Sequence, residues 1–567
     1  MAPDTTPDVT APDATLSDKP TILLLGATGM FGGWLARDLA ALDECNLIIA
    51  ARSADKLQDL AADLGCDWSS IDRTKLTAQT LSNLRHTGLL IDAAGPFQGD
   101  DGTVIKSCIK AGWDYVDLAD GRAFVSRISV FNKAAIEAGC SVISGASSTP
   151  ALSHAALDVL TKGWQSIDSV SVAICPGNKA PRGLSVMQAI LGWVGEPVKV
   201  FNHGGWHNRP GWSGTQMIDL HDLGKRPAAL AETPDLDALV TRYKPTLRAE
   251  MLAGLELPLL HNGVRLLGWL RAKRLLLNLR TFARPARWLA NLLIGIGSDT
   301  GGMRVTATGV NSDGLAVCKH WTLLARNGVG PRIPGLPALA LARQWLSNGL
   351  PKGASSAAGV LDLDELEPDF KRLSLQHITS QTLLPAPLYH RAMGDAFEEL
   401  PEITRRFHTP RTALVLSGEV TITGAQNAMG RLISKLFRFP QKTGKATLTV
   451  TVEATADGAE IWRRDFGGHV MTSTLANPNA ADSTVTESFG PVTTTLRLDR
   501  TQTGLTMTPI CQHIGRFRLP RFTLPGITAI ESWAAPNNHH FEVEISLPVL
   551  GRLCRYQGWV SIPPPVQ

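Results

Sequence analysis

Residues 21–33 read TILLLGATGMFGG, an apolar run that meets three glycines at intervals of three residues, Gly26, Gly29 and Gly32. This order predicts a buried strand that turns sharply into a helix. Glycine lets the backbone approach a pyrophosphate closely, and the start of a helix offers free N–H groups and a positive dipole end to an anion. The stretch therefore predicts a nucleotide-binding turn. The alternative is a tight strand–helix turn that binds nothing.

Strands and helices alternate from residue 21 to residue 149. Apolar runs such as NLIIAA (46–51), GLLIDAAG (88–95) and CSVISGA (140–146) are separated by segments with helical periodicity. Alternation of this kind indicates βαβ units that build a parallel sheet through right-handed crossovers. We expect residues 21–149 to form a doubly wound Rossmann domain, in which the glycine turn follows the first strand as a dinucleotide fingerprint requires.

The end of the second predicted strand indicates which dinucleotide binds. NAD-binding domains carry an acidic residue there that accepts hydrogen bonds from the ribose hydroxyls. This chain has Arg52 at that position and Lys56 one turn later. Cations pair well with a 2′-phosphate, so the sequence predicts NADP(H). The alternative is that Arg52 is an ordinary solvated surface charge.

The strand within LLIDAAGPFQGDDG (89–102) ends in Gly95, Pro96 and Phe97. Ligands of open α/β sheets bind outside the carboxyl ends of the strands. We therefore expect this loop to pass beside the nicotinamide half of the cofactor.

The remaining chain divides in two. Residues 150–382 mix strands and helices and contain a hairpin signal at Ser312–Gly314, which predicts a central α+β domain that closes the cleft. Residues 383–567 contain many short period-two runs separated by turn residues, which predict an antiparallel sandwich or open barrel. The expected fold class is α/β, with an N-terminal Rossmann domain, a central α+β domain and a C-terminal antiparallel β-rich domain.

Composition indicates a globular chain of several domains. The 567 residues are 44% hydrophobic and 19% charged, with a net charge of +4 that does not suggest a nucleic-acid partner. Eight cysteines form no CxxC pair, so neither a metal site nor a disulfide framework is expected. Residues 1–20 lack a signal pattern and are expected to be a disordered tail. The sequence also lacks an apolar run long enough to span a membrane, and a cytoplasmic location is expected.

The motifs GATGMFGG, AARSADKL, DAAGPFQGDDGTVIKSCIKAGWDYVDLADG and GASSTPALSHAAL occur in this order over about 130 residues. In these segments the chain resembles the saccharopine dehydrogenase-like NADP-binding oxidoreductases. The last domain, with WRRDFGG, ESFGP and RYQGW, is similar to an uncharacterised domain fused behind such reductases in bacteria. The resemblance implies a cofactor site formed by Gly26, Thr28, Gly29, Gly32, Arg52, Lys56, Gly95, Pro96 and Phe97.

Hydride transfer also requires a proton donor. None of the four tyrosines has a lysine four residues later, which disfavours the Tyr-x-x-x-Lys pair of short-chain dehydrogenases. Asp117 and His154 are weak catalytic candidates, although Asp117 also suits a helix cap and His154 suits helix packing. Asn178 and Arg182, in PGNKAPRGLS, are weak candidates for substrate contact, and a turn explains them equally well.

Residues 257–298 contain seven cationic side chains among leucines and tryptophans and no acidic residue. This composition is typical of an amphipathic helix lying on an anionic membrane. The alternative is a pair of helices that bury their leucines and leave their arginines in water.

Together these features predict an NADP(H)-dependent oxidoreductase with a small-molecule substrate, hydrophobic or lipid-like in character, and peripheral contact with an anionic membrane. The resemblance does not specify the substrate, and the sequence shows no arginine constellation for binding an amino acid. The alternative is a non-catalytic NADP(H)-binding protein whose C-terminal domain binds a lipid or a protein partner. Oligomeric state is not predicted.

Overall fold

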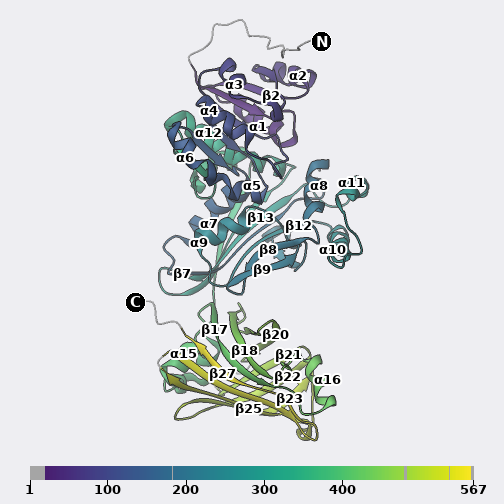
Figure 1. Cartoon of the computed structure of the whole chain (residues 1–567), viewed down its shortest axis with the longest axis vertical. Coiled ribbons are helices and arrows are strands. Elements are labelled where there is room, and N and C mark those ends of the chain that lie inside the picture. The colour runs from purple at the N-terminus through teal and green to yellow at the C-terminus, as the bar shows by residue number, and fades with distance from the viewer. Residues whose placement is uncertain (1–18, 182, 478–481, 536, 563–567) are drawn as a thin grey trace.

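A computed structural model describes residues 19–181, 183–477, 482–535 and 537–562. Three β-sheets follow one another along the long axis of the molecule, with the N-terminal domain at one end and the C-terminal domain at the other (Figure 1). Residues 1–18 of the expected tail lie outside the described residues. The predicted fold class is confirmed.

The N-terminal sheet is parallel and has the strand order β15-β6-β5-β4-β1-β2-β3. Its strands are β1 (Thr21–Leu25), β2 (Asn46–Ala51), β3 (Asp67–Ser70), β4 (Leu89–Asp92), β5 (Asp114–Asp117), β6 (Ser141–Ser144) and β15 (Gly353–Ser356). The helices of this region are α1 (Met30–Ala40), α2 (Ala54–Leu64), α3 (Ala78–Leu84), α4 (Thr103–Ala111), α5 (Arg122–Ser126), α6 (Asn132–Glu137), α7 (Ser153–Thr161), α12 (Leu336–Asn348) and α13 (Glu367–Arg372).

The N-terminal sheet does not end where the expected domain boundary at residue 149 lies. Its seventh strand, β15, comes from residues 353–356, within the segment expected to be central. The helix α12 stops at Asn348, before Gly349, and its inner face joins the same core as the strands of the first sheet. A strand that returns after 200 residues leaves no local signal at residue 149, so only the folded chain reveals it.

The central sheet is mixed and has nine strands. The order is β10-β11-β12-β7-β13-β14-β16, with β8 pairing with β12 and β9. The expected hairpin is present, since β13 and β14 are antiparallel neighbours. The strands are β7 (Ser166–Cys175), β8 (Pro197–Asn202), β9 (Gly205–Pro210), β10 (Gln216–Asp219), β11 (Lys225–Leu230), β12 (Arg248–Gly254), β13 (Gly301–Val310), β14 (Ala316–Ala325) and β16 (Gln376–Leu383). The helices are α8 (Leu184–Trp193), α9 (Asp235–Tyr243), α10 (Pro258–Ala272) and α11 (Ala283–Leu292).

The first two domains are joined firmly. One hydrophobic core runs from β1 and α1 through α7 and α12 to β7, β12 and β13. Arg122 of α5 donates to Asp237 of α9 at 2.5 and 2.7 Å and to the backbone carbonyl of Lys199 at 2.8 Å. The central domain therefore holds a defined position at the carboxyl edge of the first sheet.

The C-terminal domain is a closed antiparallel barrel of ten strands with its own core. The sequence predicts a sandwich or an open barrel, but β22 pairs with both β21 and β23, so the sheet closes on itself. The strands are β17 (Ala413–Thr423), β18 (Gly444–Ala454), β19 (Glu460–Phe466), β20 (His469–Ala476), β21 (Thr484–Phe489), β22 (Val492–Arg500), β23 (Gly504–Ile514), β25 (Gly526–Ala535), β26 (Asn538–Leu547) and β27 (Gly551–Ser561). A short strand β24 (Phe517–Arg518) and the helices α14 (Leu388–Met393), α15 (Glu402–Phe407) and α16 (Ala428–Leu436) complete the domain.

Candidate nucleotide-binding and active site

The glycine turn between β1 and α1 has the geometry of a cradle. Gly26 has a φ of +81°, and a Cβ there would lie 2.8 Å from the backbone of Ala93 and Ala94. A Cβ on Gly32 would overlap the carbonyl oxygen of Gly26 and lie 2.8 Å from its carbonyl carbon. Gly26 therefore allows the turn and Gly32 allows α1 to pack against it, which are two of the tasks of glycines in dinucleotide-binding turns.

The first turn of α1 is available to an anion. Gly29 is the N-cap residue and supplies no side-chain cap, and the first turn contains no acidic residue. A groove of about 330 Å³ runs along this helix start, and Thr28, Gly29, Arg37 and Lys56 are among its lining residues. Backbone N–H groups and the positive end of the helix dipole thus face an open groove.

The predicted ribose end of the site is cationic. Arg52 follows β2 directly and is exposed, and Lys56 of α2 lines the groove. The pKa of Asp72 is lowered mainly by hydrogen bonds from Thr74 and in smaller part by the charge of Arg52. Cations such as Arg52 and Lys56 can pair with a phosphate group.

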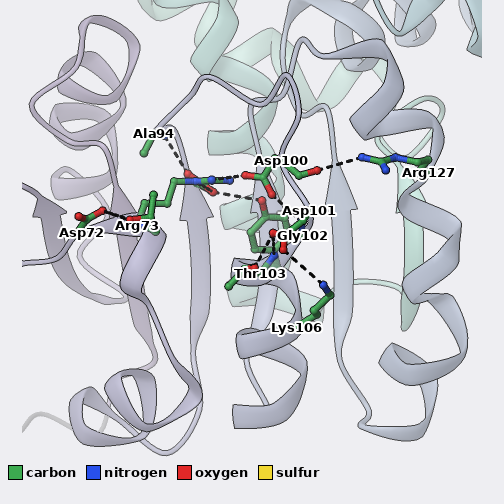
Figure 2. Close-up of polar contacts among 12 residues, drawn as sticks. Asp72, Arg73, Ala94, Asp100, Asp101, Gly102, Thr103, Lys106 and Arg127 are labelled. Carbon is green, nitrogen blue, oxygen red and sulfur yellow. Dashed lines mark hydrogen bonds and ion pairs between the residues drawn. The ribbon is translucent and has the colours of Figure 1, made fainter.

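The loop after β4 is held by a charged network that the sequence did not reveal (Figure 2). Arg73 donates to Asp92 at 2.7 Å and also pairs with Asp100, and its guanidinium lies 5.1 Å from the centre of the Phe97 ring. Asp100 in turn accepts a hydrogen bond from Gly102 N at 2.7 Å. The network fixes both ends of the loop predicted to pass the nicotinamide.

Asp92 explains why this arginine is needed. Its side chain is completely buried at the end of β4, where burial raises the pKa of the carboxyl and the guanidinium of Arg73 opposes that rise. A carboxylate at the end of a buried strand requires a cation. In the sequence, the aspartate that ends the apolar run LLID (89–92) is the signal for a buried carboxylate that needs a cationic partner.

The loop residues themselves divide into two groups. Gly95 and Pro96 are exposed on the side of the glycine turn, where they remain candidates for the cofactor site. Phe97 is buried and packs on Phe124 with ring centres 5.6 Å apart. The Phe97 side chain therefore anchors the loop to the hydrophobic core through Phe124.

Asp117 ends β5 directly beside Asp92 of β4. It is fully buried, and one carboxylate oxygen accepts hydrogen bonds from Gly145 N, Ala119 N and the Ser144 hydroxyl at 2.8, 2.9 and 3.0 Å. Among the described residues, the other oxygen has no hydrogen-bond partner. Burial raises the pKa of Asp117 to about 7, a value suited to a general acid.

His154 lies deeper, at the start of α7. Its side chain is fully buried, 3.6 Å from Asp235, and its ring centre lies 5.3 Å from that of Tyr243. Burial lowers its pKa to about 3, with a smaller contribution from Arg242. A neutral, enclosed imidazole is a poor proton donor, so this geometry favours the packing role.

The two substrate candidates have different outcomes. Asn178 is buried in the central domain, and its side-chain amide donates to the carbonyls of Leu293 and Ile296 at 2.7 and 2.6 Å. These contacts tie residues 293–296 to the end of β7, and a substrate contact stays a prediction. Arg182 lies outside the described residues.

The described residues contain no group of three or more His, Cys, Asp or Glu side chains able to hold a metal ion, and all eight cysteines are free. Within the same part of the chain, no helix combines the length and apolarity needed to cross a bilayer.

Comparison with known families assigns both ends of the chain. Residues 22–159 match the saccharopine dehydrogenase NADP binding domain, and residues 400–560 match a domain of unknown function, DUF4166. A comparison with curated proteins finds no match.

Two solved structures align with 64% of this chain at low sequence identity. Apo saccharopine dehydrogenase (L-Glu forming) from Saccharomyces cerevisiae has 15% identity and a TM-score of 0.46, over 64% of this chain and 100% of that one. Homospermidine synthase from Legionella pneumophila in complex with NAD has 14% identity and a TM-score of 0.40, over 64% of this chain and 92% of that one.

Proposed function

We propose that this protein, whose residues 22–159 match the saccharopine dehydrogenase NADP binding domain, is an NADP(H)-dependent oxidoreductase acting on a hydrophobic, lipid-like substrate. The observation that carries the proposal is the glycine turn beside the cationic groove. Cβ atoms at Gly26 and Gly32 would collide with neighbouring backbone, Lys56 lines the groove, and Arg52 directly follows β2. A bound nicotinamide would supply or accept the hydride.

The residues of this chain would then have separate tasks. The turn at Gly26, Gly29 and Gly32 binds the pyrophosphate through backbone N–H groups, while Arg52 and Lys56 bind the 2′-phosphate. The loop bearing Gly95 and Pro96, held from behind by the Arg73 network, orients the reactive half of the cofactor. The residues with these tasks all follow the carboxyl ends of strands in the first sheet.

Asp117 is the proposed proton donor. Its raised pKa keeps a proton available near neutral pH, and its bonds to Ala119 N and Gly145 N fix its position. Because the side chain is fully buried, this role requires a local rearrangement that brings the substrate into contact with the Asp117 oxygen that has no partner among the described residues. As an acid, Asp117 predicts that turnover falls as pH rises through about 7. Asp117→Asn should abolish that fall and lower kcat about a hundredfold or more.

Cofactor choice is tested by Arg52→Glu. Losing a charge-assisted hydrogen bond costs about 1.5–3 kcal/mol, so NADPH affinity should fall about 10- to 150-fold. NADH affinity should change by no more than about threefold, because it lacks the 2′-phosphate. Lys110→Glu, an equal change of charge at the exposed end of α4, is the matched control. Equal losses for both nucleotides would refute the assignment.

The hydrophobic substrate is proposed from the surface of the central domain. Between residues 257 and 298 the described side chains include many large apolar ones exposed to solvent: Leu259, Leu266, Trp269, Leu275, Leu277, Phe282, Trp288, Leu289, Leu292, Ile294 and Ile296. Only part of this segment packs inward, through residues such as Leu267, Leu276 and Leu279. We call the exposed part the α10–α11 surface.

The charges of the α10–α11 surface favour an anionic bilayer as the source of substrate. Arg271 caps α8 by donating to three backbone carbonyls and pairs with Glu196. The other six cations form no ion pair with any described residue: Arg265, Lys273, Arg274, Arg280, Arg284 and Arg287. Cations interleaved with exposed leucine and tryptophan suit an interfacial helix. NADPH oxidation should therefore be sought with long-chain carbonyl, imine and enoyl substrates presented in vesicles.

The barrel interior favours a second candidate, a non-catalytic NADP(H)-binding protein that holds an apolar ligand. A cavity of about 90 Å³ lies inside the barrel, lined mainly by aromatic and aliphatic side chains. Arg464 reaches it as a buried cation, paired with Glu487 at 3.3 Å and bonded to Ser473 at 2.9 Å. NADPH binding without turnover across the substrate panel, together with a co-purifying apolar molecule, would favour this candidate.

A further inference from the structure

One end of the C-terminal barrel collects several connections between strands. The helix α16 joins β17 to β18, the segment around β24 joins β23 to β25, and residues 548–550 join β26 to β27. Antiparallel pairing places these connections at the same end, since Ile422 pairs with Gly444, Val492 with Ile514 and Leu547 with Gly551. In Figure 1, α16 lies at the edge of the barrel, on the same side of the view as α10 and α11.

The helix α16 is fastened to the barrel by hydrogen bonds and by Ile433, which packs against the barrel core. Asn427 caps the helix by accepting from Gly430 N at 2.8 Å and donates to the carbonyl of Leu550 at 2.8 Å. Ser434 is buried and donates to the carbonyl of Leu553 at 3.0 Å. These contacts decide which face of the helix points outward.

The outward face of α16 is apolar. Met429, Leu432 and Leu436 follow helical spacing along one side, and Leu436 is 78% exposed. Phe517 and Phe522, on the connection between β23 and β25 at the same end of the barrel, are 74% and 76% exposed. With Val549 they form the barrel-end surface. A soluble surface rarely gathers so many large apolar side chains without a partner.

The charges around this surface have one sign. Residues 420–452, 500–530 and 545–567 contain no aspartate or glutamate. Six exposed cations surround the apolar side chains and form no ion pair with any described residue: Arg431, Lys435, Arg438, Arg516, Arg518 and Arg521. Asp465, near the β19–β20 turn, is already paired with Arg463 at 2.8 Å. The partner must therefore be anionic as well as apolar.

We propose that the barrel-end surface docks on an anionic membrane, as a second contact besides the α10–α11 surface. A bilayer with anionic headgroups removes the leucines and phenylalanines from water and neutralises the cations at once. A second copy of this chain would oppose the same cations to one another across a symmetric contact. A nucleic acid would pair the cations but leave the aliphatic side chains in water. Two weak contacts on one particle bind far more tightly than either one alone.

The proposal concerns the partner of the proposed enzyme, but its test needs no turnover. The full-length chain is floated with vesicles of phosphatidylcholine, with or without about one third phosphatidylserine, at about 0.1 M salt. We expect about tenfold stronger binding to the anionic vesicles, and loss of that gain at about 1 M salt.

Variants separate the two surfaces. Leu432→Gln with Leu436→Gln should weaken flotation about tenfold, as should Trp269→Gln with Trp288→Gln on the α10–α11 surface. Leu315→Gln with Leu383→Gln, two exposed leucines on the central sheet, is the matched control and should float like the parent. Circular dichroism and thermal unfolding that match the parent verify the fold of every variant.

Three results would overturn the proposal. The first is unchanged flotation of the α16 variant while the α10–α11 variant is impaired, and the second is no preference for anionic vesicles. The third is retention of a short duplex DNA without vesicle binding, which would assign the surface to nucleic acid. Absence of hydride transfer would refute the proposed function alone, because flotation is independent of it.

Discussion

Gly32 and Gly33 are adjacent glycines of α1 for which the structure predicts opposite effects of one added methyl group. A Cβ on Gly32 would lie 2.8 Å from the carbonyl carbon of Gly26 and overlap its oxygen, whereas a Cβ on Gly33 would meet only the Ala27 carbonyl oxygen at 3.5 Å. Carbon atoms normally touch at about 3.5–4.0 Å, so Gly32→Ala requires α1 or the turn to move by about 1 Å. Backbone lies on both sides of this contact, so no side-chain rotamer relieves it.

The magnitudes follow from these contacts. Overpacking costs about 1–3 kcal/mol, and the upper part of that range applies where backbone must move. Alanine in a helix returns up to about 1 kcal/mol relative to glycine. Gly32→Ala should therefore destabilise the protein by about 1–2 kcal/mol, whereas Gly33→Ala should be neutral or stabilise it by up to about 1 kcal/mol.

Thermal unfolding without cofactor measures the difference. The two variants should differ in stability by about 1–3 kcal/mol, and at about 2–4 °C per kcal/mol they should melt about 2–12 °C apart, with Gly32→Ala the lower. A fluorescence titration should also show NADPH affinity about tenfold or more weaker in Gly32→Ala, because the pyrophosphate turn is displaced. Gly33 lines the groove, so it serves as the control for stability only. Equal melting temperatures would refute the proposed close packing of turn and helix.

Two further predictions concern buried ionisable groups. Arg73→Met leaves the Asp92 carboxylate buried without its cation and should destabilise the protein by about 3–5 kcal/mol; Lys106→Met, which loses only an exposed pair with Asp101 at 4.0 Å, should cost under about 0.5 kcal/mol. Comparable denaturant midpoints for the two variants would contradict this. His154 is neutral when folded and has a pKa of about 3, so the unfolded chain gains a proton first below about pH 6.5, and stability falls as pH drops toward 3. His154→Phe should remove about 2 kcal/mol of that loss at pH 5, and parallel pH profiles of stability for parent and variant would refute it.

The fold of the N-terminal domain and its glycine turn could be predicted from the sequence because their signals are local. A buried strand, a turn that needs positive φ at Gly26, and a helix that must pass close to it at Gly32 lie within 13 residues. Arg52 follows directly on the next strand. Such features depend on neighbours in the chain, so pattern and spacing are enough to expose them.

Only the tertiary structure shows the features that are formed by residues far apart in the sequence. The cation that neutralises Asp92, the strand β15 that completes the first sheet, and the pairing of β22 with β23 that closes the barrel all join segments with no shared local pattern. The apolar residues of α16 illustrate the same limit: their helical spacing predicts one apolar face, and only the hydrogen bonds of Asn427 and Ser434 to β27 and the residue before it turn that face outward. Periodicity predicts which residues share a helix face. Whether that face is buried depends on which other segments of the chain pack against it.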